Sequence, residues 1–218
     1  MSAYIGMCLN DGAFLAADSR RTDVQSDTPQ NKIIKKIYKL NNNTAIATGG
    51  LGTIGHIARE RVQEIIDGHD LDYEDLILIV QEIFSQEYTD SLKKFPNHGI
   101  PLVAILAGKD TKDNKGFICS LSSNDNFKPF LIKGAGKPYF SGSNTNLVSL
   151  IASNKFNMMC YSNTLQLDRW AIESLKDISL MDSHVGFPIQ LVKVGNKYIE
   201  KFPVEMTFTS FSRDFQLK

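Results

Sequence analysis

The chain has 218 residues, of which 42% are hydrophobic, so it can bury the core of one large domain or of two small ones. Its 24 basic and 24 acidic side chains give a formal net charge of zero, which argues against a protein steered to nucleic acid by its charge. No apolar run is long enough to span a membrane, no signal-peptide pattern opens the chain, and three widely spaced cysteines argue against a disulfide framework, so a cytoplasmic protein is expected.

The first eighteen residues predict a β-hairpin that returns to the beginning of the chain. Two apolar runs, 4–9 and 13–17, flank Asp11-Gly12, which is a strong turn signal. Such a hairpin brings Asp18, at the end of the second strand, beside Ser2. A serine in second position is small enough for the initiator methionine to be removed. Ser2 would then carry a hydroxyl and a free α-amine, which makes a nucleophile with its own base.

The rest of the chain alternates groups of strands with pairs of helices. Strands are predicted from alternation and from β-branched or aromatic content, and helices from apolar residues spaced three and four apart. A polar excursion loop over 19–31 is followed by strands over 32–40 and 44–48, and then by helices over 53–67 and from Asp70 or Asp72 to 95. Three strands come next, over 101–107, 116–121 and 127–133, and after them helices over 145–153 and 165–180. The chain ends with a hairpin of strands 188–194 and 198–202 and a last strand within 204–211.

This order predicts one domain, over residues 1–218, of the α+β class. Consecutive hairpins imply antiparallel pairing, not a doubly wound parallel sheet. Helices that come in two pairs suggest two stacked antiparallel sheets with a helical layer outside each. No repeat, low-complexity segment or flexible linker divides the chain.

A glycine-rich turn follows the predicted strand 44–48 and opens a helix. Its Gly50-Leu51-Gly52-Thr53-Ile54-Gly55 pattern matches the dinucleotide-binding fingerprint, but the preceding strands form hairpins, and no acid ends a parallel strand about 20 residues later. A second interpretation is a turn whose backbone amide stabilises an anion. The simplest one is that Gly49-Gly50 only turns the chain.

The segment from Ser2 to Gly50 resembles a proteasome β-type subunit, a family that includes the bacterial ring proteases and the ancestral bacterial β-like proteins. The resemblance rests on the spacing from Ser2 to Asp18 and on the following motifs: Asp11-Gly12, Ala16-Ala17-Asp18-Ser19-Arg20, Lys35-Lys36-Ile37 and Thr48-Gly49-Gly50. It is weaker later, where Gly134-Ala135-Gly136 resembles the family's Gly-Ser-Gly turn and 183–191 its corresponding loop and strand.

The resemblance implies an N-terminal nucleophile (Ntn) hydrolase with a four-layer αββα sandwich. The lysine beside the aspartate would lower the basicity of the terminal amine and help to activate the hydroxyl. The functional residues that it implies are Ser2 as nucleophile, Asp18 and Lys36 as its charged pair, Gly49 as backbone donor to the oxyanion, Asp182 as a supporting aspartate, and Thr22, Ala47 and Leu51 as contacts to a peptide substrate.

The sequence also departs from the family pattern. The nucleophile is serine, where threonine is more usual. The loop before Lys36 is two residues longer than in most members, so Lys32 and Lys35 compete for the lysine role; on an ideal strand Lys32 and Lys36 share a face and Lys35 points away. Ala135 and Val185 occupy positions where the resemblance expects supporting serines.

Three functions are compatible with these residues. The first is a threonine-peptidase-like amidase that cleaves peptide or unfolded protein as a subunit of a homo-oligomeric ring. The second is a catalytically silent scaffold subunit of the same fold, and the third is the hydrolysis of a small amide. The chain has no P-loop, so ATP-driven unfolding needs a separate partner. Its four histidines show no metal-ligand spacing, and neither metal nor cofactor is expected.

Overall fold

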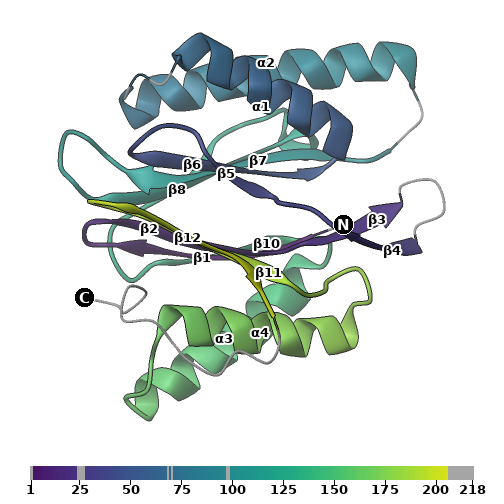
Figure 1. The fold of residues 1–218 in the computed structure, drawn as a ribbon. Coiled ribbons are helices and arrows are strands. Elements are labelled where there is room, and N and C mark those ends of the chain that lie inside the picture. Colours follow the sequence, from purple (N-terminus) through teal and green to yellow (C-terminus); the bar gives the residue numbers. More distant parts are fainter. Residues whose placement is uncertain (1, 24–27, 68, 70, 97–98, 206–218) are drawn as a thin grey trace.

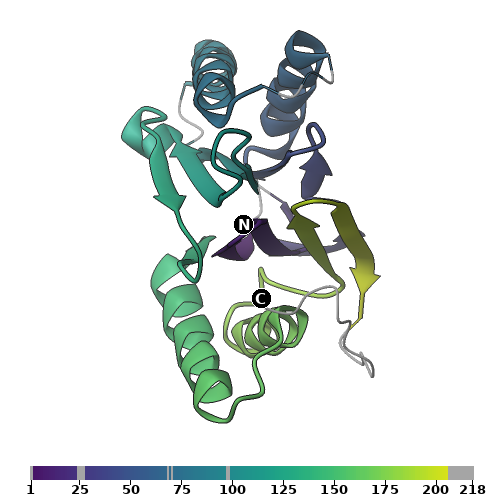
Figure 2. The same ribbon diagram turned by 90° about the vertical axis from the view of Figure 1, so that its left-hand side faces the viewer.

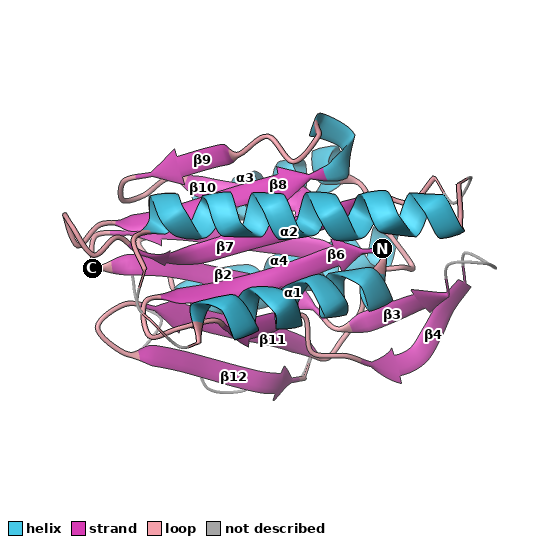
Figure 3. Cartoon of the chain, turned by 90° about the horizontal axis from the view of Figure 1, so that it is seen from above, coloured by secondary structure: helices cyan, strands magenta, loops and turns pink. Residues whose placement is uncertain are grey.

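The computed structural model describes residues 2–23, 28–67, 69, 71–96 and 99–205, with the backbone alone at 22–23 and 28–31. Two five-stranded sheets carry the fold, and every strand pair in them is antiparallel. Sheet I has the order β10-β1-β2-β11-β12 and sheet II the order β5-β6-β7-β8-β9. A separate hairpin of β3 and β4 lies at the end of the molecule where the chain begins (Figures 1 and 3).

Sheet I joins the first strands of the chain to the last. Its strands are β1 (Ala3–Leu9), β2 (Gly12–Asp18), β10 (Pro138–Gly142), β11 (Ile189–Val194) and β12 (Tyr198–Val204). Sheet II is built from the middle of the chain, with β5 (Ile37–Lys39), β6 (Thr44–Gly50), β7 (Leu102–Lys109), β8 (Gly116–Ser122) and β9 (Phe130–Lys133), and the separate hairpin consists of β3 (Arg20–Asp23) and β4 (Thr28–Ile33).

The helices form two pairs, α1 (Gly52–Ile66) with α2 (Tyr73–Lys94) and α3 (Thr145–Tyr161) with α4 (Leu167–Met181). In Figure 1 the first pair covers sheet II and the second pair covers sheet I, and Figure 2 shows the start of β1 between the two pairs. Three groups of buried apolar side chains accompany this arrangement: one between α1–α2 and sheet II, one between the two sheets, and one between sheet I and α3–α4. No helix among the described residues is both long and apolar enough to cross a membrane.

The structure confirms the predicted N-terminal hairpin. Tyr4 pairs with Ala17 and Leu9 with Gly12, and every residue of both strands is buried. The reason is that β1 and β2 are central strands of sheet I, with sheet II on one face and the helices α3 and α4 on the other. The hairpin therefore holds the beginning of the chain in the middle of the molecule.

The structure differs from the predicted elements in four places. The predicted loop 19–31 contains β3 and the first part of β4, and the predicted strand 32–40 is broken between Ile33, which ends β4, and Ile37, which begins β5. Strand β10 was not predicted, and α3 continues to Tyr161, beyond the predicted end at Ser153. The last predicted strand, 204–211, begins at the end of β12 and otherwise lies outside the described residues.

Candidate active site

Asp18 is the centre of a buried polar cluster at the beginning of the chain. It ends β2 and is fully buried. Its Oδ1 accepts hydrogen bonds from the Ala3 N–H at 2.9 Å and from the Lys36 ammonium at 2.8 Å, and its Oδ2 accepts one from the Arg20 N–H at 3.1 Å. The carboxylate is thus fixed beside Ser2 by the backbone N–H groups that begin β1 and β3.

Of the three candidate lysines, Lys36 is the one that contacts Asp18. Its side chain is 3% exposed, whereas Lys35 forms a half-exposed ion pair with Glu200 at 2.8 Å and Lys32 is exposed on β4. Burial holds the pKa of Lys36 below its ordinary value of 10.5, although the Asp18 carboxylate acts in the opposite direction. The pair combines two desolvated charges, and removal of either one would leave the other buried without a partner.

A glutamine from the far end of the chain sets the position of Lys36. Gln190 is fully buried on β11, and its Oε1 accepts hydrogen bonds from the backbone N–H groups of Lys36 at 3.1 Å and of Ile37 at 2.8 Å. These bonds cross from sheet I to the start of β5 and engage the Lys36 and Ile37 N–H groups there. They explain why the predicted strand 32–40 is interrupted at the lysine.

Ser2 lies in this cluster and is 9% exposed. Its carbonyl accepts a hydrogen bond from the Ser143 N–H at 3.0 Å. Two residues further along the chain, on β1, the Tyr4 hydroxyl donates to the Thr48 carbonyl on β6, at 2.7 Å. Chiefly because it is buried, the pKa of Tyr4 is raised well above its ordinary value, so this phenol stays neutral. Met1 lies outside the described residues.

Asp182, the residue that follows α4, also belongs to the cluster, through its contact with Ser143. Its Oδ2 accepts a hydrogen bond from the Ser143 hydroxyl at 3.2 Å, and its Oδ1 lies within hydrogen-bond distance of the His184 N–H (2.9 Å) and of the His184 Nδ1 (3.0 Å). Burial alone would raise the pKa of Asp182, but the hydrogen bonds from His184 and Ser143 hold it below its ordinary value. The carboxylate therefore remains ionised near neutral pH.

Sequence reasoning missed Ser143 because it placed the family's Gly-Ser-Gly turn at the wrong glycines. The Gly136 N–H donates to the Cys8 carbonyl, so the turn 134–136 lies at the end of β1 that is far from Ser2, and Ala135 is not near the cluster. The segment Gly142-Ser143 is the one that reaches Ser2. Ser143 directly follows β10, the strand that pairs with β1, and this strand was not predicted from the sequence.

The backbone of β6 does not fit the role predicted for Gly49. The Thr48 carbonyl points toward the Tyr4 hydroxyl, and the N–H that follows a carbonyl in a trans peptide points the opposite way. The Gly49 N–H is therefore directed at β7, where Gly49 pairs with Val103. The direction of the backbone N–H alternates from one residue to the next along a strand. The Gly50 N–H therefore points to the same side of β6 as the Thr48 carbonyl.

Of the three predicted substrate contacts, the structure describes the side chains of Ala47 and Leu51. Ala47 is fully buried between the two sheets, so its side chain does not fit a substrate contact. Leu51 packs against the core beneath α1 and α2, and its N–H donates to the Pro101 carbonyl at 3.2 Å. Thr22 lies on β3, and its side chain is outside the described part. Val185, which occupies a position where the family resemblance expects a supporting serine, is buried in the core under α4.

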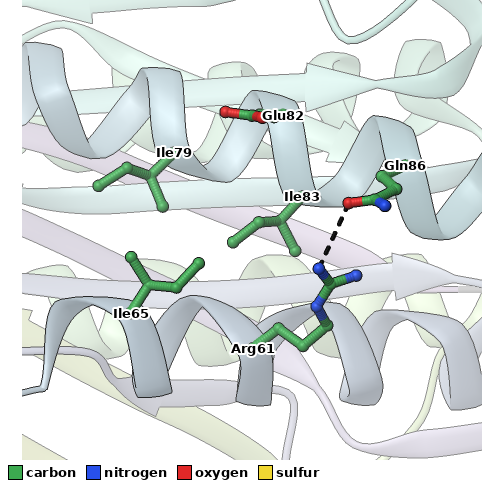
Figure 4. Close-up of a pocket in the computed structure, with 6 residues that line it drawn as sticks. All are labelled: Arg61, Ile65, Ile79, Glu82, Ile83 and Gln86. Atoms are coloured by element: carbon green, nitrogen blue, oxygen red, sulfur yellow. Dashed lines mark hydrogen bonds between the residues drawn. The ribbon is translucent and has the colours of Figure 1, made fainter.

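A surface groove lies away from this cluster, between α1 and α2. Figure 4 shows its lining by Ile65, Ile79 and Ile83, with a hydrogen bond of 3.3 Å from Arg61 to Gln86 at one end. None of its lining residues belongs to the cluster around Asp18. Among the residues that the structure describes, no group of three His, Cys, Asp or Glu side chains could hold a metal ion.

Comparison with protein families matches residues 2–161 of the chain to the model described as "Proteasome subunit". The matched segment contains Ser2, Asp18, Lys36 and Ser143, and it ends before Asp182. A search among curated proteins gives no match.

Proposed function

The chain belongs to the proteasome subunit family, and from this premise we propose that it hydrolyses peptide amide bonds with Ser2 as the nucleophile. The observation that supports the proposal most is the buried ion pair between Lys36 and Asp18, at 2.8 Å. Asp18 also accepts a hydrogen bond from the N–H of Ala3, the residue that follows Ser2. A family fold alone would not require it, since two buried charges are costly unless they serve each other or a reaction.

We also propose the four-layer αββα sandwich of the Ntn hydrolases for this chain. The two helix pairs, the two antiparallel sheets and the three apolar groups between them support that arrangement. In such a sandwich the start of β1 lies at one open end of the space between the sheets.

The proposed reaction begins after removal of the initiator methionine. The free α-amine of Ser2 takes the proton of its own hydroxyl as Oγ attacks the peptide carbonyl carbon, and a tetrahedral oxyanion forms. The amine then returns that proton to the leaving amine as the carbon–nitrogen bond breaks, which leaves an ester on Ser2. Water attacks the ester, gives its proton to the α-amine, and restores the Ser2 hydroxyl as the acid product leaves.

Lys36 and Asp18 serve this reaction through their charges. Free α-amines titrate near pH ~8, so a good share of them is protonated near neutrality and cannot act as a base. A nearby ammonium disfavours that protonation, and Asp18 keeps Lys36 charged and in place. Ser143 and Asp182 support the first residue from the other side, Ser143 through its bond to the Ser2 carbonyl.

The oxyanion would be stabilised by a backbone N–H of β6. We assign this role to Gly50 in place of Gly49, because the Gly50 N–H lies on the edge that also presents the Thr48 carbonyl to Tyr4. An amide held by strand pairing needs no reorganisation when charge develops on the substrate oxygen.

The second candidate is a catalytically silent scaffold subunit. One observation favours it: Val185 places an apolar side chain in the core where the family resemblance expects a supporting hydroxyl. In that case the polar cluster around Ser2 would have no catalytic role and would serve only to hold the beginning of the chain in place. Hydrolysis of a small amide uses the same residues and differs only in the substrate.

A substrate panel separates these functions. The purified protein, with loss of the initiator methionine verified by intact mass, is offered fluorogenic peptide amides with apolar, basic and acidic residues before the cleaved bond, and small aryl amides. We expect turnover of at least one peptide amide and none in Ser2→Ala. Hydrolysis of the aryl amides alone would favour the small-amide function, and an inactive protein that lacks Met1 would favour the scaffold.

We further propose assembly into a homo-oligomeric ring, with an ATP-dependent unfoldase as a separate partner. Leu76 and Ile83 of α2 do not support it, because they are buried in the subunit's own core. Other large apolar side chains are exposed on the helices: Ile65, Leu78, Leu150, Met158, Tyr161, Leu180 and Met181.

Sedimentation measures the assembly directly. At micromolar concentration we expect a single species at several times the 24.4 kDa of one chain. Replacement of the exposed Leu78 or Leu180 by Glu is expected to shift the species toward smaller assemblies if that helix lies in an interface. A wild-type protein that sediments only as a 24.4 kDa monomer contradicts the ring.

A further inference from the structure

The Gln190 side chain meets Lys36 through its amide oxygen, and its amide nitrogen leads outward to a second residue. Nε2 donates to the Ile37 carbonyl at 2.5 Å and to Glu200 Oε1, on β12, at 2.7 Å. A glutamine amide has one acceptor end and one donor end, so both ends are in use here. The proposed reaction gives Glu200 no role, although this residue continues the same chain of hydrogen bonds.

The strands place both side chains in the space between the two sheets. Gln190 pairs with Ala17, which precedes Asp18 on β2. Glu200 pairs with Val192. Ala17 and Val192 belong to the apolar group between the sheets, and residues opposite one another in an antiparallel pair share a face. The register of β11 and β12 shifts at Gln190, as at a β-bulge, a feature that redirects side chains and is over-represented beside active sites.

The backbone of Lys36 is bound from both sheets. Its carbonyl accepts a hydrogen bond from the Thr48 N–H of β6 at 3.3 Å, and its N–H donates to Gln190 Oε1 at 3.1 Å. From these two anchors the lysine side chain reaches Asp18, at 2.8 Å. Loss of the Gln190 anchor would displace the ammonium relative to Ser2, and a misplacement of about 1 Å can cost on the order of 10²-fold in rate.

Glu200 favours the orientation of the glutamine amide that the lysine segment requires. A flipped amide would set its NH2 group against the N–H groups of Lys36 and Ile37, and its oxygen against the Glu200 carboxylate. The Glu200 side chain is only 23% exposed, and Lys35 balances its charge from the outer side at 2.8 Å. A hydrogen bond to a carboxylate is stronger than one between neutral groups, which makes Glu200 an effective anchor for Gln190.

We propose that Glu200, acting through the Gln190 amide, is a positioning residue that keeps Lys36 where its charge acts on the Ser2 α-amine. The proposal rests on the proposed function of Ser2. When this chain of hydrogen bonds is weakened, the ammonium moves away and the α-amine holds its proton more tightly, so the pKa of the amine rises. The acid limb of the pH–rate profile then moves to higher pH, which loss of folded protein alone would not cause.

Glu200→Ala, Glu200→Gln and a control variant test the proposal on one peptide amide, with loss of Met1 verified for each protein. Glu200→Ala is expected to lower kcat about three- to tenfold, as for the loss of one buried hydrogen bond, and to move the acid limb to higher pH. Glu200→Gln removes the same charge but keeps an acceptor for Gln190, so its kcat should stay within about twofold of the wild type. The control is Glu87→Gln, because the Glu87 side chain is 15% exposed and pairs with Arg61 between α1 and α2; its kcat should stay within about twofold.

Gln190→Met breaks the whole chain of hydrogen bonds at similar side-chain volume. Its kcat is expected to fall about ten- to a hundredfold, with a larger displacement of the acid limb than in Glu200→Ala. The variant also leaves the buried N–H groups of Lys36 and Ile37 without their acceptor, so its folding is checked by chemical denaturation. Glu200→Ala keeps those two bonds, and the test therefore does not depend on whether Gln190→Met folds.

The kinetic outcomes separate the two proposals. An acid limb that stays in place in Glu200→Ala, or an equal loss of kcat in Glu200→Ala and Glu200→Gln, overturns the role of Glu200 and leaves Ser2 as the nucleophile. Absence of turnover by a wild type that lacks Met1 overturns the proposed function instead.

In the absence of turnover, titration of the α-amine followed by NMR decides the positioning role. A pKa that is higher in Glu200→Ala than in the wild type and in Glu200→Gln supports the role, and equal pKa values in the three proteins refute it. The other ionisable groups of the cluster, Asp18, Asp182 and His184, are the same in all three. A difference in the pKa of the amine therefore reports on the position of Lys36.

Discussion

Lys36→Ala is expected to lower kcat by about 10²–10⁴-fold, the range that general acid–base catalysis contributes. The variant removes the charge that keeps the Ser2 α-amine unprotonated, and the amine is the only base that the proposed reaction uses. Lys35→Ala should keep kcat within about twofold, because Lys35 pairs with Glu200 at a half-exposed position. The comparison is made on the same peptide amide with loss of Met1 verified for each protein.

The stability of Lys36→Ala has to be separated from its chemistry. The change leaves the fully buried Asp18 without its cation, which is expected to cost about 3–5 kcal/mol. The double variant Asp18→Asn/Lys36→Met removes both charges and should regain most of that stability, since an uncharged pair of similar volume leaves no unpaired charge. If the double variant is stable and fully active, the charge pair has no role in turnover. Equal losses of kcat in Lys35→Ala and Lys36→Ala would mean that the lysine role has been assigned to the wrong residue.

Gly50→Ala is expected to have the largest effect on stability of any single change in the glycine-rich turn. Gly50 has a φ of +81°, and a Cβ there would lie 1.7 Å from the Pro101 carbonyl oxygen. Backbone strain and the forced displacement of β7 should together lower the free energy of unfolding by about 2–6 kcal/mol. Chemical denaturation at equal protein concentrations measures this loss.

Gly52→Ala is the matched control for that variant. A Cβ at Gly52 meets no atom within 4 Å, and the residue opens α1, where alanine is the better helix former. We expect its stability to equal or slightly exceed that of the wild type. Equal stability of Gly50→Ala and Gly52→Ala would mean that the close approach of β6 to Pro101 is not required. The glycine-rich pattern then would have no structural explanation.

The sequence was most informative where the signals are local. Asp11-Gly12 between two apolar runs predicted the first hairpin, and the helical spacing predicted α1, α2 and α4 to within a few residues. The proximity of Asp18 to Ser2 follows from that hairpin alone. These features depend on contacts between residues that are close in the sequence, and local propensity and patterning report on such contacts.

What the sequence did not provide depends on contacts between distant segments. The break before Ile37 is imposed by Gln190, and Ser143 reaches Ser2 only because β10 pairs with β1. The direction of the Gly49 N–H depends on the strand register of sheet II, and a shift of one residue reverses it. Tyr4 had only been assigned to an apolar strand, because its hydroxyl finds a partner on β6 in the other sheet.

The central claim is that Ser2 is the nucleophile, and mapping a covalent adduct tests it most directly. The protein is treated with an electrophilic peptide probe, digested, and sequenced by mass spectrometry, with Ser2→Ala and Ser143→Ala treated in parallel. We expect one adduct per chain, on a Ser2 that has lost Met1, and the same adduct on Ser2 in Ser143→Ala. An adduct on any other residue that persists in Ser2→Ala, or no adduct on a protein that lacks Met1, would contradict the claim.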